Sequence, residues 1–170
     1  MTSEKVAPAT SPATASHEFL ALINQARQHP ELYPPRGNTA GAVMTACSNA
    51  LTYSEALHTI ASAHNEFLGS QSLSWVHVDG NAHRNPNGNF AWDAGEPIDQ
   101  AGYHSFRGEI VADGFATPAA ALEFWMQDDG PFGWGHRNLI LNCGIQEAGP
   151  AFGQYGPSGH DFYTVDMGSP

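Results

Sequence analysis

The clearest repeating pattern of hydrophobic and polar positions lies between Ser54 and Gly69. Leu57, Ile60, Ala61, His64 and Leu68 recur three or four positions apart there and form one helical stripe. Ser54 is a predicted N-cap and Gly69 a predicted helix end. His64 falls on the apolar stripe, and this position favours a histidine buried in the core over a ligand-binding one.

Two further segments have the period of a helix. The first opens at Ser16, a predicted N-cap, and stops before Pro30, because the residue preceding a proline is pushed out of the helical region. The second covers 118–127, where Thr117 is a predicted N-cap and a proline takes the first helical position. Residues 41–51 fit no single pattern.

The remaining hydrophobic runs are short and predict strands. Segments 106–116, 144–154 and 161–167 fit strands, the last two joined by a turn rich in glycine. The run "LILN", 139–142, is apolar and is expected in the core. Residues 74–102 have no sustained period, and a stretch this long without regular structure is usually functional or stabilised by a ligand.

The order of these elements predicts one α+β domain over residues 16–170. Residues 1–15 are rich in alanine, serine, threonine and proline, a composition that predicts a disordered leader. No internal repeat or second domain is indicated.

Composition narrows the function further. Six basic residues stand against seventeen acidic ones, and the net charge is −11. A surface this acidic argues against nucleic acid and anionic membranes as partners. No hydrophobic run is long enough for a transmembrane segment. The N-terminus also lacks the apolar stretch of a signal peptide. Cations, sugars, sterols and other neutral ligands remain open.

The two cysteines, Cys47 and Cys143, permit one disulfide but do not require it. Two free buried thiols are the alternative. Cys143 follows an apolar run, and this predicts a buried thiol that is a poor nucleophile. No G-x-S-x-G elbow, P-loop or dinucleotide fingerprint is present.

Histidine is the residue type that points to chemistry. The chain has nine. Four of them are expected at helix ends, on a polar face or in a turn: His17, His29, His58 and His160. The four in or beside irregular segments are the candidates: His77, His83, His104 and His136. The acids near them are Asp79, Glu96, Glu109, Asp128 and Asp129. Imidazoles with carboxylates can hold a divalent cation or act as acid and base, but scattered structural histidines are the alternative.

Seven segments follow one another in an order that resembles a known family. They read "FLALINQAR", "IASAHNEFL", "WVH", "GYHSFRGEIVADG", "ALEFWMQDDG", "GHRNLIL" and "YTVDMG". This order resembles the CAP superfamily of cysteine-rich secretory proteins, antigen 5 and pathogenesis-related proteins, and its compact bacterial branch in particular. The likeness covers residues 17–168. It implies an α-β-α sandwich of the SCP-like type, with a small antiparallel sheet between helices and a large share of loop.

The resemblance also implies a cleft built from two histidines and two acids. Position by position, the cleft residues would be His77, Glu109, Asp128 and His136, with "LILN" as the strand that fixes His136. The resemblance makes His77 and His136 the metal ligands. Candidate neighbours of the cleft are Trp125, Trp134 and Arg137, and a disulfide is open to Cys47 and Cys143 alone.

The chain departs from the family pattern in three places. Ile110 stands where asparagine is usual, which removes a polar contact expected near the cleft. Asp128 is shorter than the glutamate of animal members. The loop before His136 is longer than in bacterial members, so Phe132 and Trp134 either reshape the cleft or serve as ordinary packing.

These features predict a secreted binding module rather than a defined enzyme. The cleft would hold one divalent cation weakly, zinc above all because imidazole ligands suit it, and an adjacent groove would take a lipid or other small ligand. The alternative is a metal-assisted hydrolase of peptides or esters, with Glu109 as general base. A structural domain with a vestigial cleft is a third hypothesis. A protein partner is not indicated by the sequence.

Overall fold

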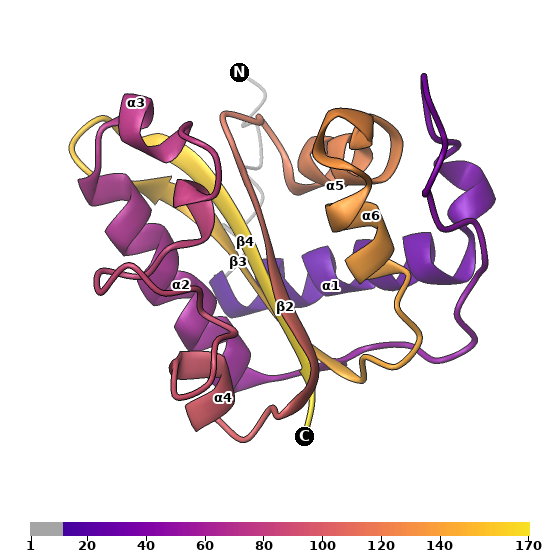
Figure 1. Ribbon diagram of the computed structural model, residues 1–170, viewed down its shortest axis with the longest axis horizontal. Helices are drawn as coiled ribbons and strands as arrows, with labels where there is room; N and C mark the ends of the chain where they lie inside the picture. Colours follow the sequence, from indigo (N-terminus) through magenta and orange to yellow (C-terminus); the bar gives the residue numbers. More distant parts are fainter. Residues whose placement is uncertain (1–11) are drawn as a thin grey trace, which may run out of the picture.

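The computed structural model describes residues 12–170, with side chains from residue 14. Six α-helices, three short 3-10 helices and four strands make up this part of the chain (Figure 1). The helices are α1 (Pro12–Gln28), α2 (Glu55–Ser70), α3 (Leu73–Val76), α4 (Pro97–Gln100), α5 (Pro118–Gln127) and α6 (Gly135–Ile140). The 3-10 helices are η1 (Pro30–Leu32), η2 (Asn81–His83) and η3 (Gly130–Phe132), and the strands are β1 (Thr52–Tyr53), β2 (Ser105–Asp113), β3 (Glu147–Tyr155) and β4 (His160–Ser169).

One four-stranded sheet, in the order β1-β3-β4-β2, forms the middle layer. Strands β3 and β4 are an antiparallel hairpin, β2 pairs antiparallel with β4, and the two-residue β1 adds in parallel to β3. The predicted small antiparallel sheet is therefore confirmed except for β1. Because β2 ends the order, it is an edge strand.

Helices cover both faces of the sheet (Figure 1). Helices α2, α3 and α4 lie on one side, and α1, α5 and α6 on the other. Alternate residues of a strand point to opposite faces, so β2 contributes to both layers. Ile110 packs in the main core with α1 and α5, whereas Val111 packs against Leu68 of α2. The predicted α-β-α sandwich is confirmed.

Helix boundaries follow local chemistry. Ser54 caps α2 by accepting a hydrogen bond from the Leu57 N–H, and Thr117 caps α5 by accepting from the Ala120 N–H. Helix α1 ends at Gln28, before Pro30, as predicted. Its start differs from the prediction.

Helix α1 begins at Pro12, not after Ser16. Ser16 is buried inside the helix, and a proline opens it, a position that costs no backbone hydrogen bond. Residues 1–11 lie outside the described residues. The predicted leader, 1–15, is therefore described only over its last four residues, which are helical.

The segment "LILN" does not form the predicted strand. Its first two residues end helix α6, and the chain then turns. A short apolar run does not distinguish a buried strand from a buried helix end, and Ile140 and Leu141 enter the main core either way. The long irregular stretch, 74–102, contains the short helices η2 and α4 and all but the first residue of α3.

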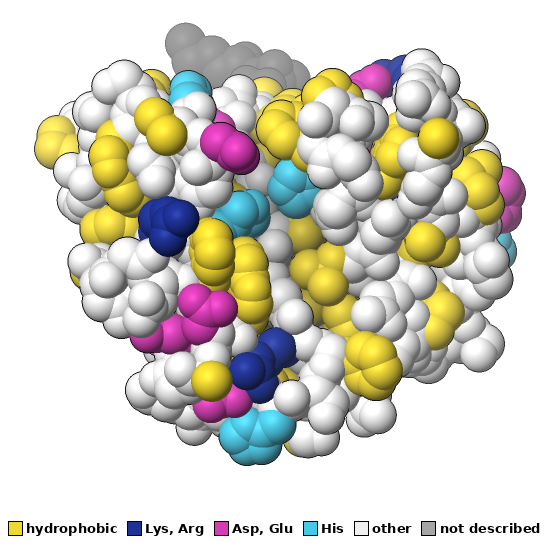
Figure 2. Space-filling model, in the orientation of Figure 1, with side chains coloured by type: hydrophobic (Ala, Val, Ile, Leu, Met, Phe, Trp, Pro, Cys, Tyr) yellow, Lys and Arg dark blue, Asp and Glu magenta, His cyan; other side chains and the backbone are white. Residues whose placement is uncertain are grey.

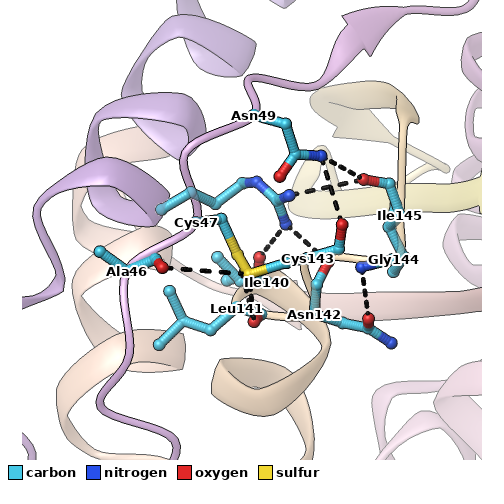
Figure 3. Close-up of a disulfide and its surroundings, with 10 residues drawn as sticks. Ala46, Cys47, Asn49, Ile140, Leu141, Asn142, Cys143, Gly144 and Ile145 are labelled. Atoms are coloured by element: carbon cyan, nitrogen blue, oxygen red, sulfur yellow. Dashed lines mark hydrogen bonds between the residues drawn. A yellow bond between two sulfur atoms is a disulfide. The ribbon is translucent and has the colours of Figure 1, made fainter.

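A disulfide between Cys47 and Cys143 ties the segment before β1 to the turn after α6 (Figure 3). Hydrogen bonds support the same junction. The Asn49 side-chain amide donates to the carbonyls of Cys143 and Ile145, at 3.3 and 3.2 Å. The buried guanidinium of Arg27 donates to the carbonyls of Ile140, Asn142 and Ile145.

Candidate functional site

Two cavities lie along the edge strand β2, where the two helix layers part. The first, named here the phenylalanine cavity, has a volume of about 450 Å³. Its walls include Val78, Val111, Phe115, Phe124 and Phe132, and His77, His83, Asp113 and His136 also line it. The second, the tryptophan cavity, has about 310 Å³ and is lined by His83, Trp92, Gly108, Glu109, Phe132, Gly135, His136 and Leu139.

His83 and His136 line both cavities and therefore stand where the two meet. His83 comes from η2 on one layer, and His136 from α6 on the other. Their ring centroids are 6.2 Å apart and their planes are inclined by 39°. Figure 2 shows this face hollowed between the two layers, with histidine side chains close together at the hollow and hydrophobic side chains beside them.

A buried carboxylate holds each of these rings. His136 Nδ1 lies 2.6 Å from Asp129 Oδ1, and the other Asp129 oxygen accepts from the Arg137 N–H at 3.2 Å. His83 Nδ1 lies 3.0 Å from Glu109 Oε1. The side chains of Asp129 and Glu109 are both 0% exposed. These two histidines and two acids are called the histidine–acid group below.

This arrangement selects one tautomer for each neutral imidazole. A carboxylate only accepts, so Nδ1 carries the hydrogen and Nε2 keeps its lone pair. Second-shell carboxylates of this kind are the usual partners of histidines that bind a metal or a polar substrate atom. The two histidines are thus oriented and chemically prepared to act as acceptors or ligands through Nε2.

A further acid, Asp166, lies behind Glu109. The two residues face each other across β4 and β2, and Asp166 is fully buried. Burial first, and then the negative charge of Glu109, raise the pKa of Asp166 well above its usual range. Ionising both of two buried carboxylates on paired strands is unfavourable, because the two negative charges repel each other and neither is hydrated. Asp166 is therefore the member of this pair that favours its protonated form.

His64 is buried, in agreement with the prediction of a core histidine. Its Nε2 donates to the Ala82 carbonyl at 2.8 Å and lies 3.6 Å from Glu109 Oε1. It thereby fixes the loop that carries His83.

The structure places the residues predicted from the sequence in different surroundings. Glu109 and His136 are part of the histidine–acid group. His77 lines the phenylalanine cavity, but its Nε2 bonds Asp113 Oδ2 at 3.0 Å, so the partner of His136 is His83. Asp128 lies on the surface and forms an ion pair with Arg36 at 2.8 Å, while its neighbour Asp129 holds His136.

The predicted neighbours of the cleft are mainly structural. Trp125 is buried, its Nε1 donates to the Val111 carbonyl, and its ring centroid is 6.3 Å from that of His136. Trp134 is buried and donates to the Asn38 carbonyl. Arg137 is buried and donates to the carbonyls of Tyr33, Val43 and Met126, and burial lowers its pKa.

The structure also shows the surroundings of two residues that depart from the family pattern, Phe132 and Ile110. Phe132 is 60% exposed at the cleft and lines both cavities, so it shapes them. Ile110 is buried in the main core, on the face of β2 opposite Glu109. An asparagine at position 110 would therefore point into the core and would not contact the cleft, so the cleft loses no polar contact there.

Three residues of this region were missed by the sequence reasoning or left open by it: His83, Asp129 and Asp113. Asp129 has a signal, because it stands four positions after Trp125 and three after Met126, where the buried stripe of α5 would continue past the end of the helix at Gln127. His83 and His77 lie in the same irregular segment, where no period distinguishes them.

A resident metal would have few protein ligands. Within residues 12–170, no three His, Cys, Asp or Glu side chains are grouped so that they could hold a metal ion. The donor set does fit a cation bound by two imidazoles, because each Nε2 retains its lone pair. The same part of the chain contains no helix with the length and hydrophobicity needed to cross a bilayer.

Comparison with known proteins identifies the fold. The chain is similar to an outer surface protein from Borrelia burgdorferi, with a TM-score of 0.63 at 14% identity, covering 94% of this chain and 96% of that one. It is similar to a cysteine-rich secretory protein from Staphylococcus aureus, with a TM-score of 0.52 at 16% identity, covering 96% and 40%. Venom allergen-like protein 4 of Schistosoma mansoni gives 0.51 at 12% identity, covering 91% and 85%.

No curated protein sequence matches the chain significantly. The family model "CAP: Cysteine-rich secretory protein family", however, matches residues 20–167. This span contains the edge strand, both cavities and all four members of the histidine–acid group. The chain belongs to the cysteine-rich secretory protein (CAP) family.

Proposed function

We propose that this protein is a secreted binding module, whose cleft holds a divalent cation at His83 and His136 and a lipid or other small apolar ligand in the phenylalanine cavity. The observation that carries the proposal is the pair of imidazoles, each oriented by a buried carboxylate, at the junction of two cavities. Zinc suits such ligands better than magnesium. When bound, it would supply a Lewis-acidic centre open to a polar group of the ligand.

Secretion is supported by two features. The disulfide between Cys47 and Cys143 is of the kind that persists in oxidising compartments. Among the structurally similar proteins, one is named an outer surface protein and another a cysteine-rich secretory protein.

The hydrolase alternative has less support from the geometry. A general base must lie within hydrogen-bond reach of the water that it activates. The Glu109 side chain is 0% exposed, and its Oε1 already accepts from His83 Nδ1. Glu109 is therefore better placed to orient His83 than to activate water.

Calorimetric titration of metal-stripped protein with zinc at neutral pH tests the cation site. We expect weak one-to-one binding that is lost in His83→Ala and in His136→Ala. His29→Ala is the matched control, because His29 is an exposed histidine that pairs with Glu31 outside the cleft. Binding that survives both cleft variants, or no binding heat in the wild type, would remove the cation from the proposal.

His77→Ala separates the two possible ligand pairs. If His77 rather than His83 binds the metal with His136, only His77→Ala and His136→Ala abolish binding. The structure favours His83, because the Nε2 of His77 is engaged by Asp113.

A further inference from the structure

Asp113 joins three elements at one end of the phenylalanine cavity. It is the last residue of β2, and its Oδ2 lies 3.0 Å from His77 Nε2 at the end of α3 and 2.8 Å from His160 Nε2 at the start of β4. Both histidines meet the same oxygen. A carboxylate has about four lone-pair sites on its two oxygens, so Oδ1 retains acceptor capacity.

The charge at this end of the cavity is negative. Neutral histidines that donate through Nε2 leave the Asp113 charge uncompensated. Asp79 adds a second carboxylate to the lining. Within the described residues 12–170, no lysine or arginine side chain lines this cavity. Acidic and histidine side chains also border the upper part of the hollow in Figure 2.

The rest of the cavity is apolar and aromatic. Phe124 stacks obliquely on Phe115, with ring centroids 5.2 Å apart, and meets Phe132 edge-on at 5.9 Å. Together with Val78 and Val111 these rings form a wall suited to a hydrocarbon chain. Aromatic faces also attract cations rather than anions. A volume of about 450 Å³ lies in the range of small-ligand sites.

We propose that the phenylalanine cavity binds an amphiphilic amine, whose ammonium group donates to Asp113 and whose apolar chain lies along Phe115, Phe124 and Phe132. The inference rests on the proposed function only in that the same cavity takes the ligand. It adds the charge of the ligand and the residue that selects it. A fatty acid whose carboxylate lies at this end of the cavity would meet the charges of Asp113 and Asp79, so we expect metal-stripped protein to bind it more weakly than the amine.

Three probes with the same ten-carbon chain separate charge from apolar burial: decylammonium, decanol and decanoate, each below its micelle concentration. Calorimetry of metal-stripped wild-type protein should give the order decylammonium, then decanol, then decanoate. The variant Asp113→Asn should lose decylammonium affinity by at least about tenfold, because a hydrogen bond to a charged group is removed. Its affinity for decanol should not change.

Two controls isolate the contact. Glu18→Gln removes the same charge from an exposed position on α1, and it should leave all three affinities unchanged. Asp79→Asn removes the other acid of the cavity, and a loss equal to that of Asp113→Asn would overturn the assignment to Asp113. If Asp113→Asn does not fold, the wild type still decides: decylammonium must shift the imidazole NMR signals of His77 and His160, and decanol must shift them less.

The outcomes also separate this inference from the proposed function. Equal affinity for decanol and decylammonium, or tighter binding of decanoate, overturns the charge selection and leaves the apolar cavity standing. Failure of all three probes overturns both the inference and the ligand part of the proposed function. The zinc titration of His83 and His136 variants decides the cation site independently.

Discussion

Removal of the disulfide should destabilise the protein through its unfolded state. Cys47 and Cys143 are separated by 96 positions, so their bond closes a loop that takes up more than half of the chain. In the chain-entropy description, breaking a cross-link of this span lowers the free energy of unfolding by about 4.7 kcal/mol at 25 °C. Residual structure in the unfolded chain reduces the effect, and we expect about 3–5 kcal/mol.

The folded state should survive the change. Asn49 donates to carbonyls of the same turn (Figure 3), and Arg27 of α1 donates to carbonyls there too, so the two segments remain joined when the sulfur atoms are separated. The cleft is formed by other elements. Zinc binding and the circular dichroism spectrum should therefore be unchanged under native conditions.

Urea unfolding with and without a reducing agent measures the effect. The dependence on urea should also steepen after reduction, because the freed unfolded chain exposes more surface. The double variant Cys47→Ala/Cys143→Ala should match the reduced wild type and be insensitive to the reductant. A loss below about 1 kcal/mol, or a changed native spectrum, would refute a mechanism based on the unfolded state.

Three further predictions follow from buried contacts. The raised pKa of Asp166 means that its contribution to stability is complete below its unfolded pKa, about 4, and is lost as pH rises toward its folded pKa. Asp166→Asn should therefore gain stability over wild type increasingly as pH rises above about 4 in urea titrations, and parallel profiles would contradict this. A Cβ at Gly149 would stand 1.9 Å from the backbone nitrogen of His58, so Gly149→Ala should lower the free energy of unfolding by about 3 kcal/mol in the same assay. Gly135→Ala is the control, because its Cβ would meet open space and the free energy of unfolding should change little. Asparagine amides, chiefly that of Asn89, donate to Glu96 and lower its pKa. Glu96→Gln should therefore increase amide hydrogen exchange in the 81–97 loop at neutral pH. Unchanged exchange would show that the charge of Glu96 is not needed to hold this loop.

Much of the fold could be predicted because its helices are marked by local chemistry. Ser54 and Thr117 cap the helices predicted from the hydrophobic period, and Pro30 ends the first one. The segment 139–142 could not be assigned in this way, since a short apolar run fits a buried strand and a buried helix end equally. Its role in the core was predictable, but its conformation was not.

The site was predictable in kind and only partly in detail. Glu109 lies in a strand that the sequence marks, His136 was predicted from the family resemblance, and the structure brings both into one group. The choice between His77 and His83 depends on how the 74–102 segment folds over β2, and no periodicity reports this. The choice between Asp128 and Asp129 depends on how the chain turns between the end of α5 and η3, where one position separates the surface from the core.

The edge strand explains why the cleft has two polar ends with an apolar middle. Glu109, Val111 and Asp113 share one face of β2 because strand residues alternate, and the first and last of them are about 13 Å apart along the strand. Glu109 serves the histidine pair, Asp113 serves His77 and His160, and Val111 lies between them in the apolar wall. Because each carboxylate has its own histidines, a cation at one end and an ammonium group at the other do not compete for the same atoms. The two proposed ligands therefore act on separate groups of one strand, and the zinc and alkylammonium titrations report on them separately.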